Sequence, residues 1–397
     1  MPRFEPFPAL RYHRDPLQDV SAPPYDVLSE ADRQALADRH PHNIVHVDVP
    51  LESQGPDRYQ IAGATLASWI SEGVLQIDPE PSFTIYRMSF HDASGRSRST
   101  VGVFGALEVV DEGAGGVLPH ERTTPKAKTD RLDLTRATLT NLSPVWGLCL
   151  APGLSDLLQD PGEDLGSVSI DGVVHSFERV TDANRLRAIS EHVARTSVVI
   201  ADGHHRYAIS RVFRDEQRQR DTGTAGRGEL TMTYVQELVD DQLSVEAIHR
   251  LYTDVSFTTL SEVLQRSFDF LGPVAVTSEV TQLMDQKGCL VLVHPDGQGT
   301  LISPKKEVFA GQRNLDGARL EFALASLEHS VNYQHGVDLV RDMVTSGQAQ
   351  GGILIRPVTV EEIQRTASEG LLMPPKSTFF TPKLLTGPVL RPLSDLR

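Results

Sequence analysis

The fold prediction begins from residues 198–207, which read VVIADGHHRY. The first four residues are apolar, as in a buried strand, and the strand is expected to end at Asp202. Gly203 permits a tight turn. Apolar residues then recur at three- and four-residue spacing over 209–213, which predicts a helix beginning near His204. A strand, a glycine turn and a helix in this order are typical of an α/β protein.

This predicted corner suits an anion. The N-terminus of a helix presents unpaired N–H groups and the positive end of the helix dipole, and Gly203 lets the backbone approach closely. His205 and Arg206 could add charge-assisted hydrogen bonds, so we predict a phosphate site here, at the helix start that His204 opens. Asp202 could cap the helix, hold Mg²⁺ or orient a histidine. The alternative is that Asp202 is only a helix cap and the histidines are surface residues.

Strand-like and helix-like patterns alternate along the rest of the chain. Strands are expected at 44–49, 83–90 and 101–110, a hairpin at 168–180 with Asp171-Gly172 as its turn, and helices at 30–39, 58–71 and 182–194. We therefore predict a composite, mixed α/β (α+β) fold. Its expected parts are an N-terminal α/β segment at 1–112, a phosphate-binding core at 113–250, and a C-terminal α/β segment at 251–397 that ends in a docked Pro-rich tail.

Composition excludes several classes of protein. With 38 basic and 53 acidic residues, the chain carries a formal charge of −15 and has no basic cluster, which argues against a nucleic-acid partner. Two cysteines cannot build a disulfide framework or a cysteine zinc site, and they fit a cytoplasmic location. There is no run of 18 apolar residues and no apolar core of a signal peptide at the start, so we expect no membrane partner.

A second polar segment, residues 119–144, reads PHERTTPKAKTDRLDLTRATLTNLSP. His120 and Glu121 could act as an acid–base pair, with Glu121 as the general base. Lys128 and Arg131 could hold phosphates, and Asn141 is a further candidate for phosphate binding. The alternative is a solvated amphipathic helix preceded by a loop.

Two further segments contain constrained polar residues. Residues 373–383, MPPKSTFFTPK, place Lys376 and Ser377 on a proline-bounded loop that could bind a phosphate or carboxylate, or that could be part of a docked tail. Residues 22–27, APPYDV, are interpreted as a structural turn. The chain has no P-loop, no HExxH helix, no GxSxG elbow and no GxGxxG between a strand and a helix.

Taken in order, these motifs resemble one family. PPYDV, then P-x-N-I at 41–44, then HExT…KxDR…NxSP, IADGHHRY, an HR pair at 249–250 and MPPKSTFFTPKL resemble the bacterial and archaeal domain-of-unknown-function 1015 family. The resemblance extends from about residue 8 to residue 392. Here the HR pair follows Ala247-Ile248, where a Pro-Thr lead-in is expected, so no role is assigned to His249 or Arg250.

The DGHHR motif is also similar to the DGHTR motif of ParB-like free serine kinases, and more distantly to the phosphate-binding segments of ParB and sulfiredoxin. This local resemblance implies a ParB/sulfiredoxin-like nucleotide-binding core. In such a core Asp202, His204, His205 and Arg206 would contact phosphate or its metal. His205 stands where those kinases have threonine.

The leading hypothesis is a nucleotide-dependent phosphotransferase that uses ATP or ADP with Mg²⁺. Its small-molecule substrate would be a hydroxylated metabolite such as free serine. Glu121 would take the proton, while Lys128, Arg131 and Lys376 would neutralise charge. One alternative is a non-catalytic nucleotide-binding regulatory protein, and another is a nucleotide-independent enzyme that uses His120 and Glu121. The oligomeric state, a homodimer included, stays open.

Overall fold

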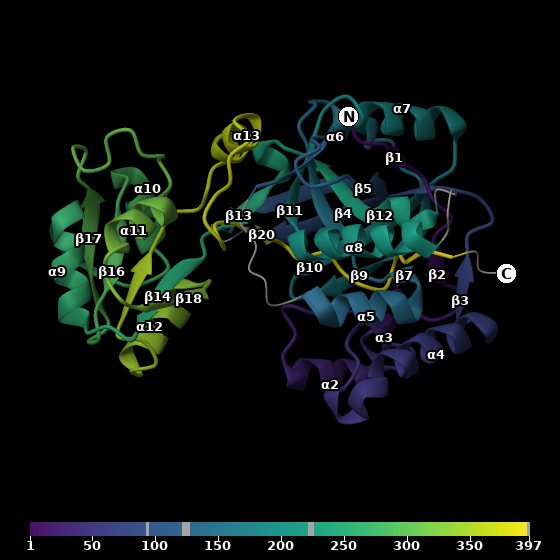
Figure 1. The fold of residues 1–397 in the computed structure, drawn as a ribbon, viewed down its shortest axis with the longest axis horizontal. Helices are drawn as coiled ribbons and strands as arrows, with labels where there is room; N and C mark the ends of the chain where they lie inside the picture. The colour runs from purple at the N-terminus through teal and green to yellow at the C-terminus, as the bar shows by residue number, and fades with distance from the viewer. Residues whose placement is uncertain (93–94, 121–127, 221–225, 395–397) are drawn as a thin grey trace. The chain divides into compact units, whose positions relative to one another are not determined.

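The structure is a computed structural model that describes residues 1–92, 95–120, 128–220 and 226–394 (Figure 1). The chain forms two compact units. The first comprises Met1–Ser244 and Pro382–Arg397, and the second comprises Val245–Thr381. The fold is mixed α/β, as predicted. The three-part division of the sequence stays a prediction; in the structure, one sheet of the first unit contains strands from both sides of its 112/113 boundary.

The first unit is built on a long mixed sheet. Over the described residues its strand order is β6-β11-β8-β12-β5-β4-β10-β9, and β1 pairs with β5. The bounds are β1 (Phe4–Glu5), β4 (Phe83–His91), β5 (Ser97–Glu108), β6 (Val117–Pro119), β8 (Val145–Cys149), β9 (Glu163–Ile170), β10 (Val173–Val180), β11 (Val198–Asp202) and β12 (Leu230–Glu237). The β6–β11 and β8–β12 pairs are parallel, and the other pairs of the sheet are antiparallel.

Helices cover this sheet (Figure 1). α7 (Ala183–Val193) contributes Ile189 and Val193 to the core that contains Val198 and Ile200 of β11. α8 (His204–Arg220) contacts β8 and β12 and packs against α5 (Lys128–Thr138), which packs against α4 (Arg58–Ser71). The shorter elements of this unit are α1 (Leu17–Val20), α2 (Glu30–Arg39), α3 (Val45–Asp48), α6 (Leu154–Leu157), β2 (Leu10–Tyr12), β3 (Leu75–Ile77), β7 (Thr140–Asn141) and β21 (Arg391–Pro392).

The second unit is a smaller sheet whose two faces are both apolar. Its strand order is β15-β17-β16-β19-β14-β18, with bounds β14 (His249–Thr253), β15 (Phe268–Ala275), β16 (Leu290–Val293), β17 (Gln298–Pro304), β18 (Ser330–Gln334) and β19 (Gly351–Leu354). Leu290 and Leu292 join the core of α9 (Phe257–Ser267) and α11 (Asp316–Leu324). Val291 and Val293 join the core of α10 (Val280–Lys287) and α12 (Val337–Thr345). Alternate residues of β16 thus face opposite helix layers.

The remaining elements come from the first and last parts of the second unit's sequence. α13 spans Val360–Ser368, and β20 (Phe379–Thr381) pairs with β13 (Ser244–Glu246), whose last two residues begin the second unit. After β20 the chain returns to the first unit, where the backbone N–H of Leu10 donates to the carbonyl of Leu390. No helix in the described part of the chain is long and apolar enough to cross a membrane.

One predicted strand is wrong. Residues 44–49 alternate in polarity, but the structure has the helix α3 over Val45–Asp48. The side chain of Asn43 explains the change, because its Oδ1 accepts the N–H of Val45 and its Nδ2 donates to the carbonyls of Asp19 and Ser21. This side-chain bonding stabilises a local turn in place of a strand. The predicted strand at 83–90, the helices at 30–39 and 58–71 and the hairpin at Asp171-Gly172 are confirmed.

Candidate functional site

The predicted strand, turn and helix around Asp202 are confirmed. β11 ends at Asp202, Gly203 has a φ of +83°, and α8 begins at His204. β6 runs parallel to β11, with Pro119 opposite Ile200. Because the carboxyl ends of parallel strands meet at one edge of a sheet, His120, which follows β6, lies beside the same corner.

Asp202 is the centre of a charge cluster. Its Oδ1 accepts the N–H of Gly203 at 2.7 Å, and its Oδ2 lies 3.2 Å from Nζ of Lys383 and 3.5 Å from Nη2 of Arg206. Burial alone would raise the pKa of Asp202, but the charges of Lys383 and Arg206 and the Gly203 hydrogen bond together lower it below its ordinary value. Asp202 is therefore an anion held between two cations.

The contacts of Asp202 decide whether its carboxylate could bind the predicted Mg²⁺ ion. One carboxylate oxygen accepts a backbone N–H, and the other faces Lys383 and Arg206. A divalent cation there would have to displace both positive side chains, whereas Mg²⁺ sites are built from oxygen ligands with few competing cations. The donor set around Asp202 does not favour Mg²⁺, so we assign Asp202 no metal-dependent step.

Arg206 folds back across the turn. Its Nη1 donates to the carbonyl of Pro144, and only 11% of its side chain is exposed. A Cβ at position 203 would lie 3.1 Å from Nε of Arg206 and 3.3 Å from Cα of Val145. The guanidinium therefore covers the glycine turn. An approaching anion would meet this side chain, which differs from the open cradle of backbone amides that the sequence predicts.

Gly203→Ala tests how tightly this corner is built. We expect the variant to lower the free energy of unfolding by about 1–2 kcal/mol, because a left-handed backbone disfavours a Cβ and because that Cβ would press on Arg206. Chemical denaturation followed by tryptophan fluorescence measures the change, since Trp69 and Trp146 both lie in the first unit. Gly113→Ala is the matched control: Gly113 also has a positive φ, but a Cβ added there would have no atom of the described residues within 4 Å. A larger loss at Gly113 than at Gly203 would contradict the crowding argument.

Arg206 also lines a small polar pocket in the first unit. The pocket draws on segments that are far apart in the sequence: Tyr25, Asp48, Arg131, Leu134, Thr135, Thr140, Asn141, Leu142, Ser143, Arg206, Ile209, Ser210 and Thr231. Its volume is about 40 Å³. A buried water needs about 10–15 Å³, so the pocket has room for a few waters or one small anion, and not for a whole nucleotide.

Arg131 is held rigidly at the wall of this pocket. Its Nη1 donates to the backbone carbonyl of Asp48 at 2.7 Å and to Oδ1 of Asp48 at 2.9 Å. The centre of its guanidinium lies 3.3 Å from the centroid of the Tyr25 ring. Ser143 donates to the same Asp48 oxygen at 3.2 Å. The pocket thus contains two arginines, each already fixed by a carboxylate and a backbone carbonyl.

His120 and His204 form a buried pair behind Asp202. Their ring centroids are 4.9 Å apart, and His120 Nδ1 donates to the carbonyl of Ile200 at 2.5 Å. Burial lowers the pKa of His120 to about 4. Burial, followed by the neighbouring His120, lowers the pKa of His204 well below its ordinary value. Both rings are therefore neutral at pH 7, and neither provides a cation for phosphate.

The remaining residues predicted to bind phosphate or act in catalysis do not form one group in the structure. His205 is half-buried at the start of α8. Asn141 lines the pocket, but its Oδ1 accepts the N–H of Met232 and a bond from Arg391, which gives it a structural role. Lys128 is the first residue of α5. Glu121 falls outside the described residues.

Lys376 and Ser377 belong to the second unit. Lys376 has a φ of +57°, and its carbonyl accepts a bond from Arg250. Ser377 is buried and donates to the carbonyl of Pro374 at 2.7 Å. These contacts hold the proline-bounded loop in place, and the phosphate-binding role of both residues stays a prediction.

Sequence reasoning missed four residues of the site: one that pairs with Asp202 and three that line the pocket. Lys383 ends the same MPPKSTFFTPK motif, but the prediction named Lys376 in its place. Tyr25 belongs to the APPYDV segment, for which the sequence suggests only a structural turn, and it lines the pocket. Asp48 and Ser143 were not singled out. Ser143 lies within the NxSP motif at 141–144, which gave a signal that was not used, and Asp48 lies outside the quoted motifs and has no signal of its own.

Together, the fold and the site define a mixed α/β protein with a charge cluster at a strand–turn–helix corner and a small polar pocket beside it. The chain belongs to the family described as "Protein of unknown function (DUF1015)", whose model matches residues 4–326. No curated protein matches the sequence.

Several solved structures show weak likeness to the chain. A free serine kinase variant in complex with AMP has 12% identity and a TM-score of 0.40, over 70% of this chain and 89% of that one. SbnI with a C-terminal truncation, from Staphylococcus aureus, has 14% identity and a TM-score of 0.38, over 73% and 87%. A conserved hypothetical protein from Pyrococcus furiosus has 12% identity and a TM-score of 0.36, over 67% and 87%. Scores this low establish neither a shared fold nor a shared function.

Proposed function

We propose that this protein is a nucleotide-dependent phosphotransferase that acts on a small hydroxylated metabolite such as free serine. The observation that carries the proposal is the convergence of Arg131 and Arg206 on one polar pocket, next to the Asp202–Lys383 pair. Arginine forks match the geometry of phosphate oxygens, and phosphoryl transfer depends mainly on positioning and charge stabilisation.

The size of the pocket limits what it would hold. Its volume of about 40 Å³ suits a single phosphoryl group, so the nucleoside of ATP or ADP would lie outside it. The pocket wall also carries the hydroxyls of Ser143, Ser210 and Thr231. Ser143 donates to Asp48, while Ser210 donates to the carbonyl of Arg206 and bonds to the hydroxyl of Thr231. Each hydroxyl would therefore have to exchange its present partner for a phosphate oxygen. Two fixed arginines and several hydroxyls would thus surround the group being transferred.

In the proposed reaction, the substrate hydroxyl oxygen attacks the terminal phosphorus of the nucleotide. A new O–P bond forms while the bond from that phosphorus to the leaving nucleotide oxygen breaks, and Arg131 and Arg206 stabilise the charge. The hydroxyl proton passes to Glu121, which directly follows His120 in the sequence. Mg²⁺, when bound to the nucleotide, would neutralise phosphate charge. Lys128 and His205 are further proposed phosphate ligands.

The nucleotide-independent alternative has less support. His120 has no exposed surface, its Nδ1 is bonded to the carbonyl of Ile200, and its pKa is lowered to about 4 by burial. A buried neutral ring is poorly placed to exchange protons with a substrate. A cytoplasmic location remains part of the proposal, and the oligomeric state, a homodimer included, stays open.

Arg206→Gln tests the phosphate site. We expect the variant to bind ADP and ATP at least about tenfold more weakly than the wild type, because a hydrogen bond to a charged group contributes about 1.5–3 kcal/mol. Calorimetric titration measures the affinity. Arg211→Gln is the matched control, since Arg211 lies on the same helix and pairs with the exposed Glu112. Equal affinities in the two variants would contradict the assignment of Arg206.

Turnover is tested separately with serine and each nucleotide, followed by phosphorus NMR for phosphoserine. Glu121→Gln should abolish the product while nucleotide affinity stays unchanged. Nucleotide binding without any product, across a panel of hydroxylated amino acids, would reject the kinase and favour the non-catalytic regulatory alternative. If no nucleotide binds at all, both hypotheses are wrong.

A further inference from the structure

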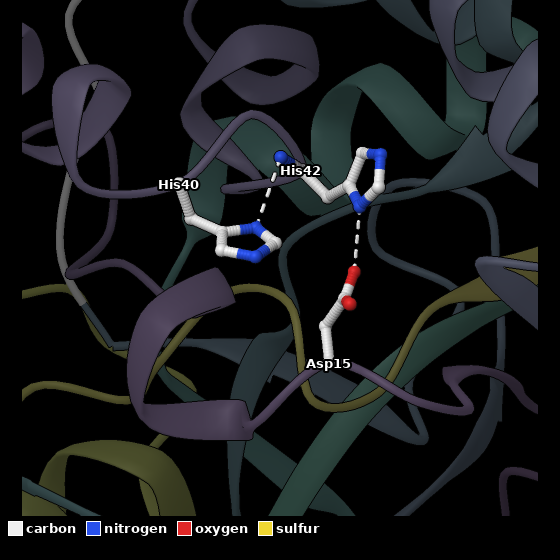
Figure 2. Close-up of side chains that lie close together, drawn as sticks. All are labelled: Asp15, His40 and His42. Atoms are coloured by element: carbon white, nitrogen blue, oxygen red, sulfur yellow. Dashed lines mark hydrogen bonds and ion pairs between the residues drawn. The ribbon is translucent and has the colours of Figure 1, made fainter.

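A cluster of metal-type ligands lies in the first unit, in a part of the chain that the proposed reaction does not use. Asp15, His40 and His42 each offer one ligand atom, and these atoms all lie within 4.8 Å of one another (Figure 2). Asp15 lies between β2 and α1, His40 is the C-cap of α2, and His42 follows two residues later. All three residues are half-buried.

The surrounding contacts hold His42 in place. Its Nδ1 lies 2.6 Å from Oδ2 of Asp15, and its ring packs edge-on against Trp69 with centroids 5.6 Å apart. The hydroxyl of Tyr12 donates to the carbonyl of His42 at 2.8 Å. A carboxylate, a packed aromatic ring and a backbone bond therefore fix this imidazole before any ion binds. Such preorganisation reduces the entropy lost on binding.

The Nδ1 atom of His40 points toward His42. It accepts the backbone N–H of His42 at 3.1 Å, as Figure 2 shows. An accepting nitrogen carries no proton, so this Nδ1 has the lone pair that a metal requires. Metal binding would exchange this single backbone hydrogen bond for a coordinate bond.

We propose that Asp15, His40 and His42 bind a divalent transition-metal ion, with Zn²⁺ as the best match. Two imidazoles and one carboxylate suit zinc and its first-row neighbours, whereas Mg²⁺ and Ca²⁺ prefer oxygen ligands throughout. Zinc bonds to nitrogen and oxygen are about 2.0–2.2 Å long, which separates tetrahedral ligand atoms by roughly 3.3 Å. At that separation the ion would replace the proton that His42 Nδ1 donates to Asp15, after less than about 1 Å of movement by Asp15. In a neutral ring this proton would move to Nε2 of His42, and in a protonated ring it would leave to solvent, so that Nδ1 presents a lone pair to the ion. Water would occupy the fourth position.

The location of the cluster suggests a structural ion. His42 lies three residues before α3, which ends at Asp48, the residue that fixes Arg131 at the pocket. An ion that joins the two loops would hold the start of α3 against Asp15. The site does not depend on the proposed phosphotransferase activity, so each can fail without the other.

The test is titration of chelator-treated protein with Co²⁺, which reports tetrahedral coordination by its visible absorption, followed by displacement with Zn²⁺. The wild type should bind one ion per chain, and Asp15→Asn and His42→Asn should each bind at least about tenfold more weakly, since even outer-shell substitutions weaken metal sites by about 10–100-fold. Zn²⁺ should also raise the melting temperature of the wild type and not of these variants. His13→Asn, which alters an exposed histidine two residues from Asp15, is the matched control and should behave as the wild type.

Asp15→Asn keeps a hydrogen-bonding amide opposite His42, so it decides the outcome if His42→Asn does not fold. Circular dichroism verifies that each variant is folded. Absence of a tetrahedral Co²⁺ spectrum in the wild type would overturn the proposal. So would an affinity that is the same in the wild type, Asp15→Asn and His13→Asn, since the ion would then lie elsewhere.

Discussion

Asp202→Ala should lower the free energy of unfolding by about 2 kcal/mol, because removal of one member of a partly buried ion pair leaves its partners without that counter-charge. The Asp202 side chain is 27% exposed, which places the cost between those of a surface pair and a fully buried pair. In the wild type the Asp202 carboxylate faces Lys383 at 3.2 Å and Arg206 at 3.5 Å, and the side chains of these cations are 18% and 11% exposed. The variant leaves two desolvated positive charges next to each other. Urea unfolding followed by the fluorescence of Trp69 and Trp146 measures the loss in the first unit.

Asp133→Ala is the control for this experiment. Asp133 pairs with Arg136 on the surface of α5, with 43% and 41% of the two side chains exposed, and such pairs contribute about 0–1 kcal/mol. The double variant Asp202→Ala/Lys383→Ala should recover part of the stability lost in Asp202→Ala, since it removes one of the two cations that face the lost carboxylate. If Asp202→Ala costs no more than Asp133→Ala, the carboxylate does not organise the cluster.

Local patterns in the sequence predicted the local structure well. The alternation at 83–90 predicted β4, the helical spacing at 58–71 predicted α4, and Asp171-Gly172 predicted a hairpin turn, in which both residues have a positive φ. In each case the residues that decide the structure lie within a few positions of one another. The strand predicted at 44–49 was wrong because the Asn43 side chain bonds to Asp19 and Ser21, which are distant in the sequence.

In the candidate site, too, the local structure could be predicted from the sequence and the long-range contacts could not. The strand, turn and helix from Val198 to Tyr207 could be predicted because one short segment contains all of their signals. The salt bridge from Asp202 to Lys383 spans 181 residues, and its formation depends on the chain returning from the second unit to the first. No periodicity or propensity encodes such a contact.

The residues that line the pocket could not be predicted from the sequence, because their positions depend on the order of strands in the sheet and on the packing of the helices. β11 pairs with β6 and β8, and β8 pairs with β12, so strands that are adjacent in space are not consecutive in the chain. Arg131 of α5 and Asp48 of α3 meet across 83 residues because both helices pack against α4. Motif order could show that these segments belong to one family, but only the fold shows which of their side chains face one pocket.

The first unit should lose stability steeply as the pH falls from about 6.5 to about 4. Burial lowers the pKa values of His120 and His175 to about 4 in the folded protein, from an ordinary value of 6.5. Between these values the unfolded chain binds protons and the folded protein does not, so acid favours unfolding. The stabilisation is complete above pH 6.5, decreases through this window and is lost below it. Each histidine accounts for about 3 kcal/mol.

His175→Gln isolates one contribution. His175 Nδ1 lies 2.6 Å from the hydroxyl of Tyr86, which accepts the N–H of Leu385, so the hydroxyl donates to a neutral ring. Free energies of unfolding, measured by urea titration between pH 7 and pH 4, should show a pH slope reduced by up to about 1.4 kcal/mol per pH unit in this variant, because one proton fewer is taken up on unfolding. His91→Gln, at an exposed position, should leave the slope unchanged. An unaltered slope in His175→Gln would mean that the ring takes up a proton as readily in the folded protein as in the unfolded chain, so that burial does not lower its pKa.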